Sequence, residues 1–172
     1  KLNDKSSFYL SLARVTREPR LKNYYDAAES SGGEVPQFEK KENGEFDFDK
    51  PLVEPETMND IELGYNFLGK DISFSANFFY MLFQDEIVKQ GQVDRFGQPI
   101  TGNIDETVHT GLELSTNIKL NKYFEIIMNG SYSKNYISDG TTFVESGDGP
   151  ASEVDLTDNR ISGFPNLTFN GI

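Results

Sequence analysis

The single histidine, His109, is the residue in this sequence whose charge changes most readily near neutral pH. It stands two residues before Gly111 and four before Glu113, in a stretch where polar and apolar residues alternate. A metal ligand or proton relay at this position needs a partner on a neighbouring strand, and the sequence does not identify one. We expect the His109 side chain to lie in solvent, and we keep it as a candidate ligand contact.

The sequence lacks the residues and motifs that most catalytic and cofactor chemistry requires. The chain has no cysteine, which removes disulfides, thiolate nucleophiles and zinc-thiolate sites. It has no HExxH, GxSxG, phosphate-loop or dinucleotide-binding pattern. A net charge of -12 argues against nucleic acid, because phosphate binding needs a basic surface. We therefore expect no enzyme activity, no cofactor, no catalytic residue and no nucleic-acid partner.

Pairs of acidic residues in polar stretches supply the oxygen ligands that calcium prefers. None of them follows the EF-hand spacing, and charged residues in loops are usually solvated, so we expect no metal site. The pairs are Asp47 with Asp49, Glu145 with Asp148, and Asp155 with Asp158.

Candidate ligand contacts gather in the polar stretch that follows the first expected strand. Aromatic rings in a polar segment cost solvation free energy unless they pack on something, and rings supply rigid contact area for a ligand. Basic residues in the same region can attract an anionic ligand. Neither feature requires a ligand, because rings also pack a loop onto its neighbours and cations at strand ends occur without one. The candidates are Arg17, Arg20, Tyr24, Tyr25, Phe46, Phe48 and His109.

The residues from 58 to 83 form the clearest hairpin in the sequence. Every second residue is apolar from Ile61 to Phe67, and the same period holds from Ile72 to Leu82. Residues 68–71, with Gly69 among them, separate the two runs and predict a tight turn. The second run is long enough to cross a bilayer as a tilted strand, which takes about 9–11 residues.

Similar alternation predicts six antiparallel strands in all, and the connections between them are long and short in turn. Short turns at one end and long loops at the other are typical of outer-membrane barrels. We predict an all-β fold, an antiparallel up-and-down meander that is part of a transmembrane β-barrel, with short periplasmic turns and long extracellular loops. A soluble β-sandwich that packs its apolar faces together is the alternative. The expected strands are 6–15, 58–68, 71–84, 107–120, 122–136 and 161–172, and the long loops are 16–57, 85–106 and 137–160.

Several short motifs follow one another in an order that resembles the order found in a known protein family. They are Pro55-Glu56 before the E-L-G-Y of Glu62 to Tyr65, Phe79-Tyr80 followed by Glu86-Ile87, the G-L-E-L of Gly111 to Leu114, and Arg17 with Pro19 at the end of the first strand. Together they resemble the C-terminal barrel half of TonB-dependent outer-membrane receptors. Because the plugged barrels of such transporters have about 22 strands, six strands make up roughly a quarter of one. No plug domain is expected within residues 1–172.

The resemblance implies a segment of a receptor in the outer membrane of a Gram-negative bacterium. Such a receptor takes up a scarce nutrient, an iron chelate as in siderophore uptake, cobalamin or a glycan. The implied partners are outer-membrane lipid, a small nutrient ligand, and a periplasmic energy-coupling protein that acts through the missing plug. A passive outer-membrane barrel, either a channel or an adhesin, is the alternative within the membrane class.

Overall fold

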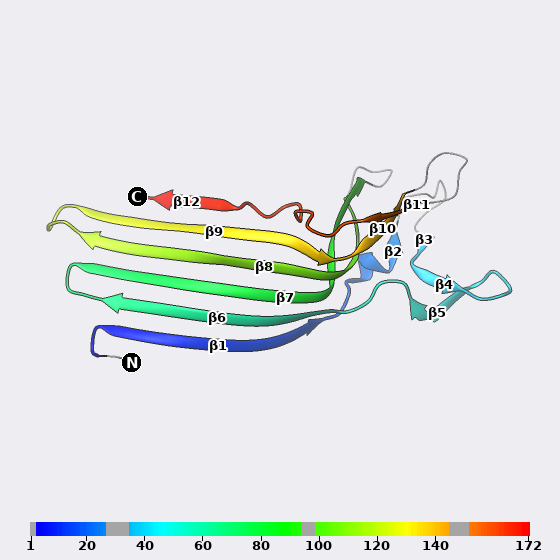
Figure 1. The fold of residues 1–172 in the computed structure, drawn as a ribbon, viewed down its shortest axis with the longest axis horizontal. Helices are drawn as coiled ribbons and strands as arrows, with labels where there is room; N and C mark the ends of the chain where they lie inside the picture. The colour runs from blue at the N-terminus through cyan, green and yellow to red at the C-terminus, as the bar shows by residue number, and fades with distance from the viewer. Residues whose placement is uncertain (1–2, 27–34, 94–98, 145–151) are drawn as a thin grey trace.

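Six strands form one antiparallel sheet in the order β1-β6-β7-β8-β9-β12 (Figure 1). The computed structural model describes residues 3–26, 35–93, 99–144 and 152–172. Each strand pairs with its neighbours in chain order along the sheet, so the predicted antiparallel up-and-down meander is confirmed. In the part of the chain that is described, no helix has the length and apolar character needed to cross a bilayer. The strands are β1 (Ser6–Arg17), β6 (Glu56–Leu68), β7 (Ile72–Val93), β8 (Pro99–Lys119), β9 (Glu125–Asp139) and β12 (Leu167–Gly171).

The strand register sorts the side chains into an apolar face and a polar face. One row of paired residues crosses all six strands on the apolar face, and its side chains are 43% to 71% exposed. A neighbouring row on the polar face carries small and hydrogen-bonding residues. Because successive side chains along a strand point to opposite faces, these two rows fix the orientation of the whole sheet. The apolar row is Leu10, Leu63, Phe78, Leu112, Tyr132 and Leu167, and the polar row is Tyr9, Gly64, Asn77, Glu113, Ser131 and Thr168.

Two glycines on the polar face allow aromatic rings to lie flat on the sheet. A Cβ atom at Gly64 would stand 1.9 Å from the ring of Tyr9, whose hydroxyl donates a hydrogen bond to Asn77 at 2.9 Å. A Cβ atom at Gly111 would stand 2.7 Å from the ring of Phe79. The missing side chains therefore leave room for rings that cover the backbone instead of projecting from it.

The connections at one end of the sheet are short. β6 and β7 are joined by residues 69–71, where the Gly69 N–H donates to the Ile72 carbonyl at 2.8 Å. Between β8 and β9, the Asn121 side-chain oxygen accepts hydrogen bonds from the N–H groups of Tyr123 and Phe124. Both connections close the chain within a few residues, as a tight hairpin requires.

The opposite end of the sheet carries the long connections and a set of short strands (Figure 1). Three two-stranded sheets form there, β2 with β3, β4 with β5, and β10 with β11. Expected loops 16–57 and 137–160 thus contain local hairpins, because pairing satisfies backbone groups that a structureless segment would leave to water. The elements are η1 (Leu21–Asn23), β2 (Tyr25–Asp26), β3 (Val35–Pro36), β4 (Phe38–Lys40), β5 (Phe46–Pro51), β10 (Thr141–Val144) and β11 (Ser152–Asp155).

Much of the expected loop 85–106 is instead strand, since β7 runs to Val93 and β8 begins at Pro99. The two strands keep one register on both sides of Asp85, whose backbone adopts a positive φ of 56°. Aspartate tolerates this left-handed conformation better than most residues. The hairpin bends here, and its outer part turns away from the line of the other strands (Figure 1). The bend brings the Glu86 side chain to the face of the sheet opposite to the one that alternation predicts for it.

Candidate functional site: a polar cluster and a basic hollow at the base of the loops

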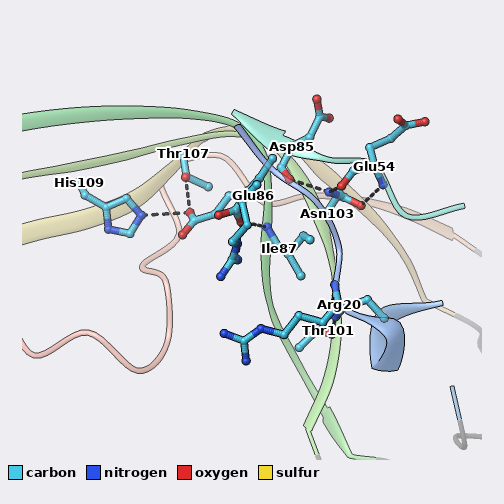
Figure 2. A network of polar contacts seen from close by, with 12 residues as sticks. Arg20, Glu54, Asp85, Glu86, Ile87, Thr101, Asn103, Thr107 and His109 are labelled. Atoms are coloured by element: carbon cyan, nitrogen blue, oxygen red, sulfur yellow. Dashed lines mark hydrogen bonds and ion pairs between the residues drawn. The ribbon is translucent and has the colours of Figure 1, made fainter. Parts of the chain in front are cut away.

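A buried polar cluster lies where the β7–β8 hairpin bends. The Glu86 carboxylate accepts a hydrogen bond from the Thr107 hydroxyl, and its Oε2 lies 3.0 Å from His109 Nε2 (Figure 2). On the other side of the imidazole, Nδ1 lies 2.9 Å from the side-chain oxygen of Asn135 on β9. By strict alternation Glu86 would share the apolar face with Leu82, and the bend at Asp85 brings it to the side of Thr107 and His109 instead.

His109 is buried, so the expectation of a solvated side chain is wrong. The residue is 5% exposed, and its ring packs edge-on against Phe83 and Phe164, with centroid distances of 5.2 Å and 4.8 Å. Alternation along β8 identifies the face on which His109 lies, but the covering segment comes from the distant connection between β11 and β12. A buried ring needs polar partners, and Glu86 and Asn135 supply them.

A small apolar core lies next to the polar cluster and holds the outer part of the hairpin against the end of β9. It contains Val88 and Ile104 from the hairpin, Ile137 from β9, and Ile161 with Leu156 from the later connection. Burial of these side chains contributes the free energy that keeps the bend in place, at about 1.5–3 kcal/mol for each large aliphatic residue. The site therefore rests on a packed support.

Glu56 replaces a backbone partner that β7 loses at the bend. Pairing between β6 and β7 ends at Thr57 and Gln84, so the N–H of Ile87 has no backbone acceptor on β6. The Glu56 carboxylate accepts that N–H at 3.1 Å and also forms an ion pair of 2.7 Å with Arg17. The Pro55-Glu56 pair of the sequence motif is thus tied to this bend.

Asn103 joins the bent hairpin to the start of β6. Its side-chain nitrogen donates to the carbonyl groups of Asp85 and Glu54 at 2.6 Å and 2.9 Å, and its oxygen accepts the Glu54 N–H at 2.9 Å (Figure 2). One amide side chain thus uses both of its polar ends to hold two segments in place.

A basic hollow of about 180 Å³ lies between the end of β1, η1 and the bent hairpin. Its floor is fixed by Asn23, which donates to the Thr101 hydroxyl at 2.7 Å and accepts the Arg20 N–H at 2.8 Å. Four cations and one carboxylate line the hollow, although the chain as a whole has a net charge of -12. The hollow therefore concentrates positive charge at one place on the surface. The lining is Arg17, Glu18, Arg20, Lys22, Asn23, Ile87, Lys89 and Thr101.

The aromatic candidates of the first long connection pack on one another. Phe38 lies at the centre of the group, with ring centroids 5.8 Å from Tyr24, 6.1 Å from Tyr25 and 5.1 Å from Phe48. Phe46 adds a contact of 6.3 Å to Phe48. Phe48 remains 60% exposed, so one ring of the cluster is open to solvent. The packing accounts for the rings in this polar segment, and their contact with a ligand stays a prediction.

Two loop side chains have shifted pKa values. A hydrogen bond and the negative charge of Glu39, whose carboxylate lies 3.1 Å away, raise the pKa of Lys50 on β5. Hydrogen bonds from the hydroxyl and the N–H of Thr157 lower the pKa of Asp155. Both shifts arise from contacts within the loop region.

The structure brings the sequence-based candidates into three groups. Arg17 and Arg20 line the basic hollow, His109 lies in the polar cluster, and the aromatic residues form their own cluster. The sequence analysis did not identify four residues that lie in these groups: Glu86, Thr107, Asn135 and Lys89. The one local sign of the bend that brings them together is the break in alternation at Gln84-Asp85-Glu86. Within the described ranges, no three His, Asp or Glu side chains are placed to hold a metal ion.

Residues 1–172, the whole chain, match the family described as "TonB dependent receptor-like, beta-barrel". The chain belongs to this family. The family resemblance drawn from the motifs is therefore confirmed, as is the assignment of the meander to a TonB-dependent receptor barrel. Members of the family are outer-membrane transporters. Comparison with curated protein sequences gives no match.

Solved structures show the same fold. The chain is 19% identical to the copper transporter OprC, with a TM-score of 0.57 over 80% of this chain and 19% of that one. It is 16% identical to the ferric yersiniabactin uptake receptor FyuA from Yersinia pestis, with a TM-score of 0.59 over 99% of this chain and 20% of that one. The siderophore receptor PirA from Pseudomonas aeruginosa is 18% identical, with a TM-score of 0.56 over 90% and 31%. The chain thus spans between a fifth and a third of the structures it resembles.

Proposed function

We propose that this chain forms one wall of an energy-coupled uptake receptor and the base of its extracellular loops, where a scarce nutrient is bound. The nutrient classes in question are iron chelates, cobalamin and glycans. The basic hollow favours an anionic chelate among them, because it gathers cations in an otherwise acidic chain. The apolar face would contact outer-membrane lipid, and the polar face would line the barrel interior.

The cations of the hollow differ in how much of their charge is available. Arg17 is paired with Glu56, so part of its charge is neutralised. Within the described part of the chain, no ion pair is formed by Lys22 or Lys89. Arg20 adds a guanidinium whose planar donors suit a carboxylate or phosphate group. An anionic ligand would therefore interact chiefly with Arg20, Lys22 and Lys89.

Ligand binding by the full-length receptor tests this proposal. Ferric citrate serves as an anionic chelate, cyanocobalamin as a neutral cofactor and maltoheptaose as a glycan. The double variant Arg20→Gln, Lys89→Gln should bind ferric citrate or a related anionic chelate at least tenfold more weakly, as expected for the loss of charge-assisted hydrogen bonds. Arg14→Gln is the matched control, because Arg14 lies on β1 but outside the hollow. Equal affinities of wild type and double variant, or binding of the neutral probes alone, would rule out an anion site here.

Transport would draw its energy from the inner membrane through a periplasmic coupling protein. That protein would contact a plug domain belonging to the same receptor, and residues 1–172 would supply the wall around it. Uptake that continues at the same rate in cells lacking the coupling protein would support a passive channel instead.

A further inference from the structure

A chain of hydrogen bonds from Ser133 through Asn135 reaches the imidazole of His109. The Ser133 hydroxyl donates to the Pro165 carbonyl at 3.2 Å, so its oxygen is free to accept from the Asn135 side-chain nitrogen at 3.0 Å. That bond orients the Asn135 amide with its oxygen toward His109 Nδ1, at 2.9 Å. Since an amide oxygen only accepts, His109 Nδ1 carries a hydrogen.

The opposite side of the imidazole faces a carboxylate. Glu86 Oε2 lies 3.0 Å from His109 Nε2 and also accepts the Thr107 hydroxyl. With the Nδ1 hydrogen already assigned, this contact needs one further proton between Nε2 and Oε2. If that proton leaves, the lone pair of Nε2 faces a carboxylate oxygen and the contact becomes repulsive.

The chain of hydrogen bonds ends on a segment that packs over the polar face. Phe164 places its ring 4.8 Å from the imidazole, and the Ile161 N–H donates to the Asn135 carbonyl at 3.1 Å. Within the segment, the Arg160 guanidinium donates to the Phe164 carbonyl at 2.7 Å. Residues 159–166 are therefore held on the wall in two ways. Backbone hydrogen bonds join them to β9, among them Ile137 N–H to the Asn159 carbonyl and Ser133 N–H to the Asn166 carbonyl, and the side chains around His109 add further contacts.

We propose that Glu86, His109 and Asn135 form a proton-operated clasp that adds to the backbone bonds holding residues 159–166 on the polar face and is lost with the shared proton. Because a rise in pH favours loss of that proton, acidic conditions close the clasp and rising pH opens it. Opening loosens a segment at the mouth of the barrel. The proposal does not depend on the identity of the ligand.

The groups packed around the imidazole agree with a cationic closed state. β7 contributes the Glu86 carboxylate, β9 contributes the neutral Asn135, and the segment contributes Phe164, whose carbonyl is bound by Arg160. On β6, Asp60 lies in the same register row as His109, across Met81. Asp60 is buried, and among the described residues its Oδ1 has no hydrogen-bond partner.

Hydrogen exchange in the full-length receptor tests the clasp. Protection factors of residues 159–166, with intrinsic exchange rates divided out, are measured between pH 5.5 and 8.5. In the wild type they should fall at least tenfold as pH rises, whereas the turn at residues 69–71 should show no such change. In His109→Gln the protection should be independent of pH, because glutamine does not titrate.

A second variant keeps the test decisive if His109→Gln does not assemble. Glu86→Gln retains an acceptor for the Thr107 hydroxyl and removes the negative charge, and its amide can either accept from Nε2 or donate to it. The pH dependence should shrink to less than threefold. A wild type with flat protection, or a Glu86→Gln variant with the full wild-type dependence, would overturn the proposal.

Discussion

Gly111 is the position where the structure predicts the sharpest effect of adding a single methyl group. A Cβ atom there would lie 2.5 Å from the Tyr132 carbonyl oxygen and 2.7 Å from the Phe79 ring, and Cβ contacts under 3.0 Å are essentially never observed. The ring of Phe79 can rotate, but the carbonyl belongs to the backbone of β9. Gly111→Ala must therefore separate β8 from β9 locally. Overpacking of this kind costs about 1–3 kcal/mol.

The assay is equilibrium unfolding of the full-length receptor by guanidinium chloride in detergent micelles. Gly171→Ala is the matched control, because the nearest atoms to a Cβ at Gly171 are 3.6 Å away, an ordinary contact distance. We expect Gly111→Ala to lower the free energy of unfolding by about 1–3 kcal/mol and Gly171→Ala to change it by less than about 0.5 kcal/mol. Equal stability of the two variants would show that the close approach of β8 and β9 at Gly111 is not as described.

Three further predictions concern the wall and the bend. Leu112→Arg places a charge on the apolar face and should reduce assembly in the outer membrane, at a cost of about 2–4 kcal/mol near the middle of the bilayer, measured as folded receptor per cell. Glu56→Ala leaves the Ile87 N–H without its acceptor and should lower the free energy of unfolding by about 1–3 kcal/mol in the same guanidinium assay. Asp85→Val forces a β-branched residue into a positive φ and should cost about 1–2 kcal/mol by that assay while weakening protection of residues 86–104 in hydrogen exchange.

Each of these predictions has a matched control. Ser115→Arg, on the polar face, should assemble far better than Leu112→Arg, and equal loss would contradict the lipid-facing assignment. Glu56→Gln keeps an acceptor for the Ile87 N–H and should be milder than Glu56→Ala. Glycine adopts a positive φ without strain, so Asp85→Gly should be milder than Asp85→Val. If both variants lost the same free energy of unfolding, the backbone conformation at residue 85 would not be the cause.

Local alternation was sufficient to predict the order of the six strands, because each strand between the turns and the bend is apolar on one face. The last expected strand, 161–172, is strand only at Leu167–Gly171, because residues 161–166 pack over the polar face instead. The row from Leu10 to Leu167 is made of residues that the sequence pattern alone places on that face. Alternation did not predict strand beyond Asp85, because one residue in a left-handed conformation interrupts the pattern while the hydrogen-bonded pairing continues. The alternation of polar and apolar residues therefore does not show that β7 and β8 remain paired beyond Asp85.

The polar cluster depended on contacts between distant segments, which a single sequence does not display. His109 was recognised as a candidate, yet its burial comes from Phe164, 55 positions later in the chain. Glu86 could be found only once the bend was known, because its side chain lies opposite to the face expected from its position. The cations of the hollow were partly recognised, and Lys89 joins them only because β7 continues past the bend.

The bend at Asp85 has a consequence for how such receptors can diversify. On the sheet side of the bend, insertion of one residue would turn every following side chain of that strand to the opposite face of the sheet, so the wall tolerates little change in length. Beyond the bend, the described parts of both hairpin strands lie outside the six-stranded ladder and form strand pairs only with each other. Matched residues can be gained or lost beyond Lys89 and Thr101, where the regular pairing ends, without altering the frame of the wall. Asp85 thus separates a part of the chain that must keep its length from a hairpin end whose length and surface can change.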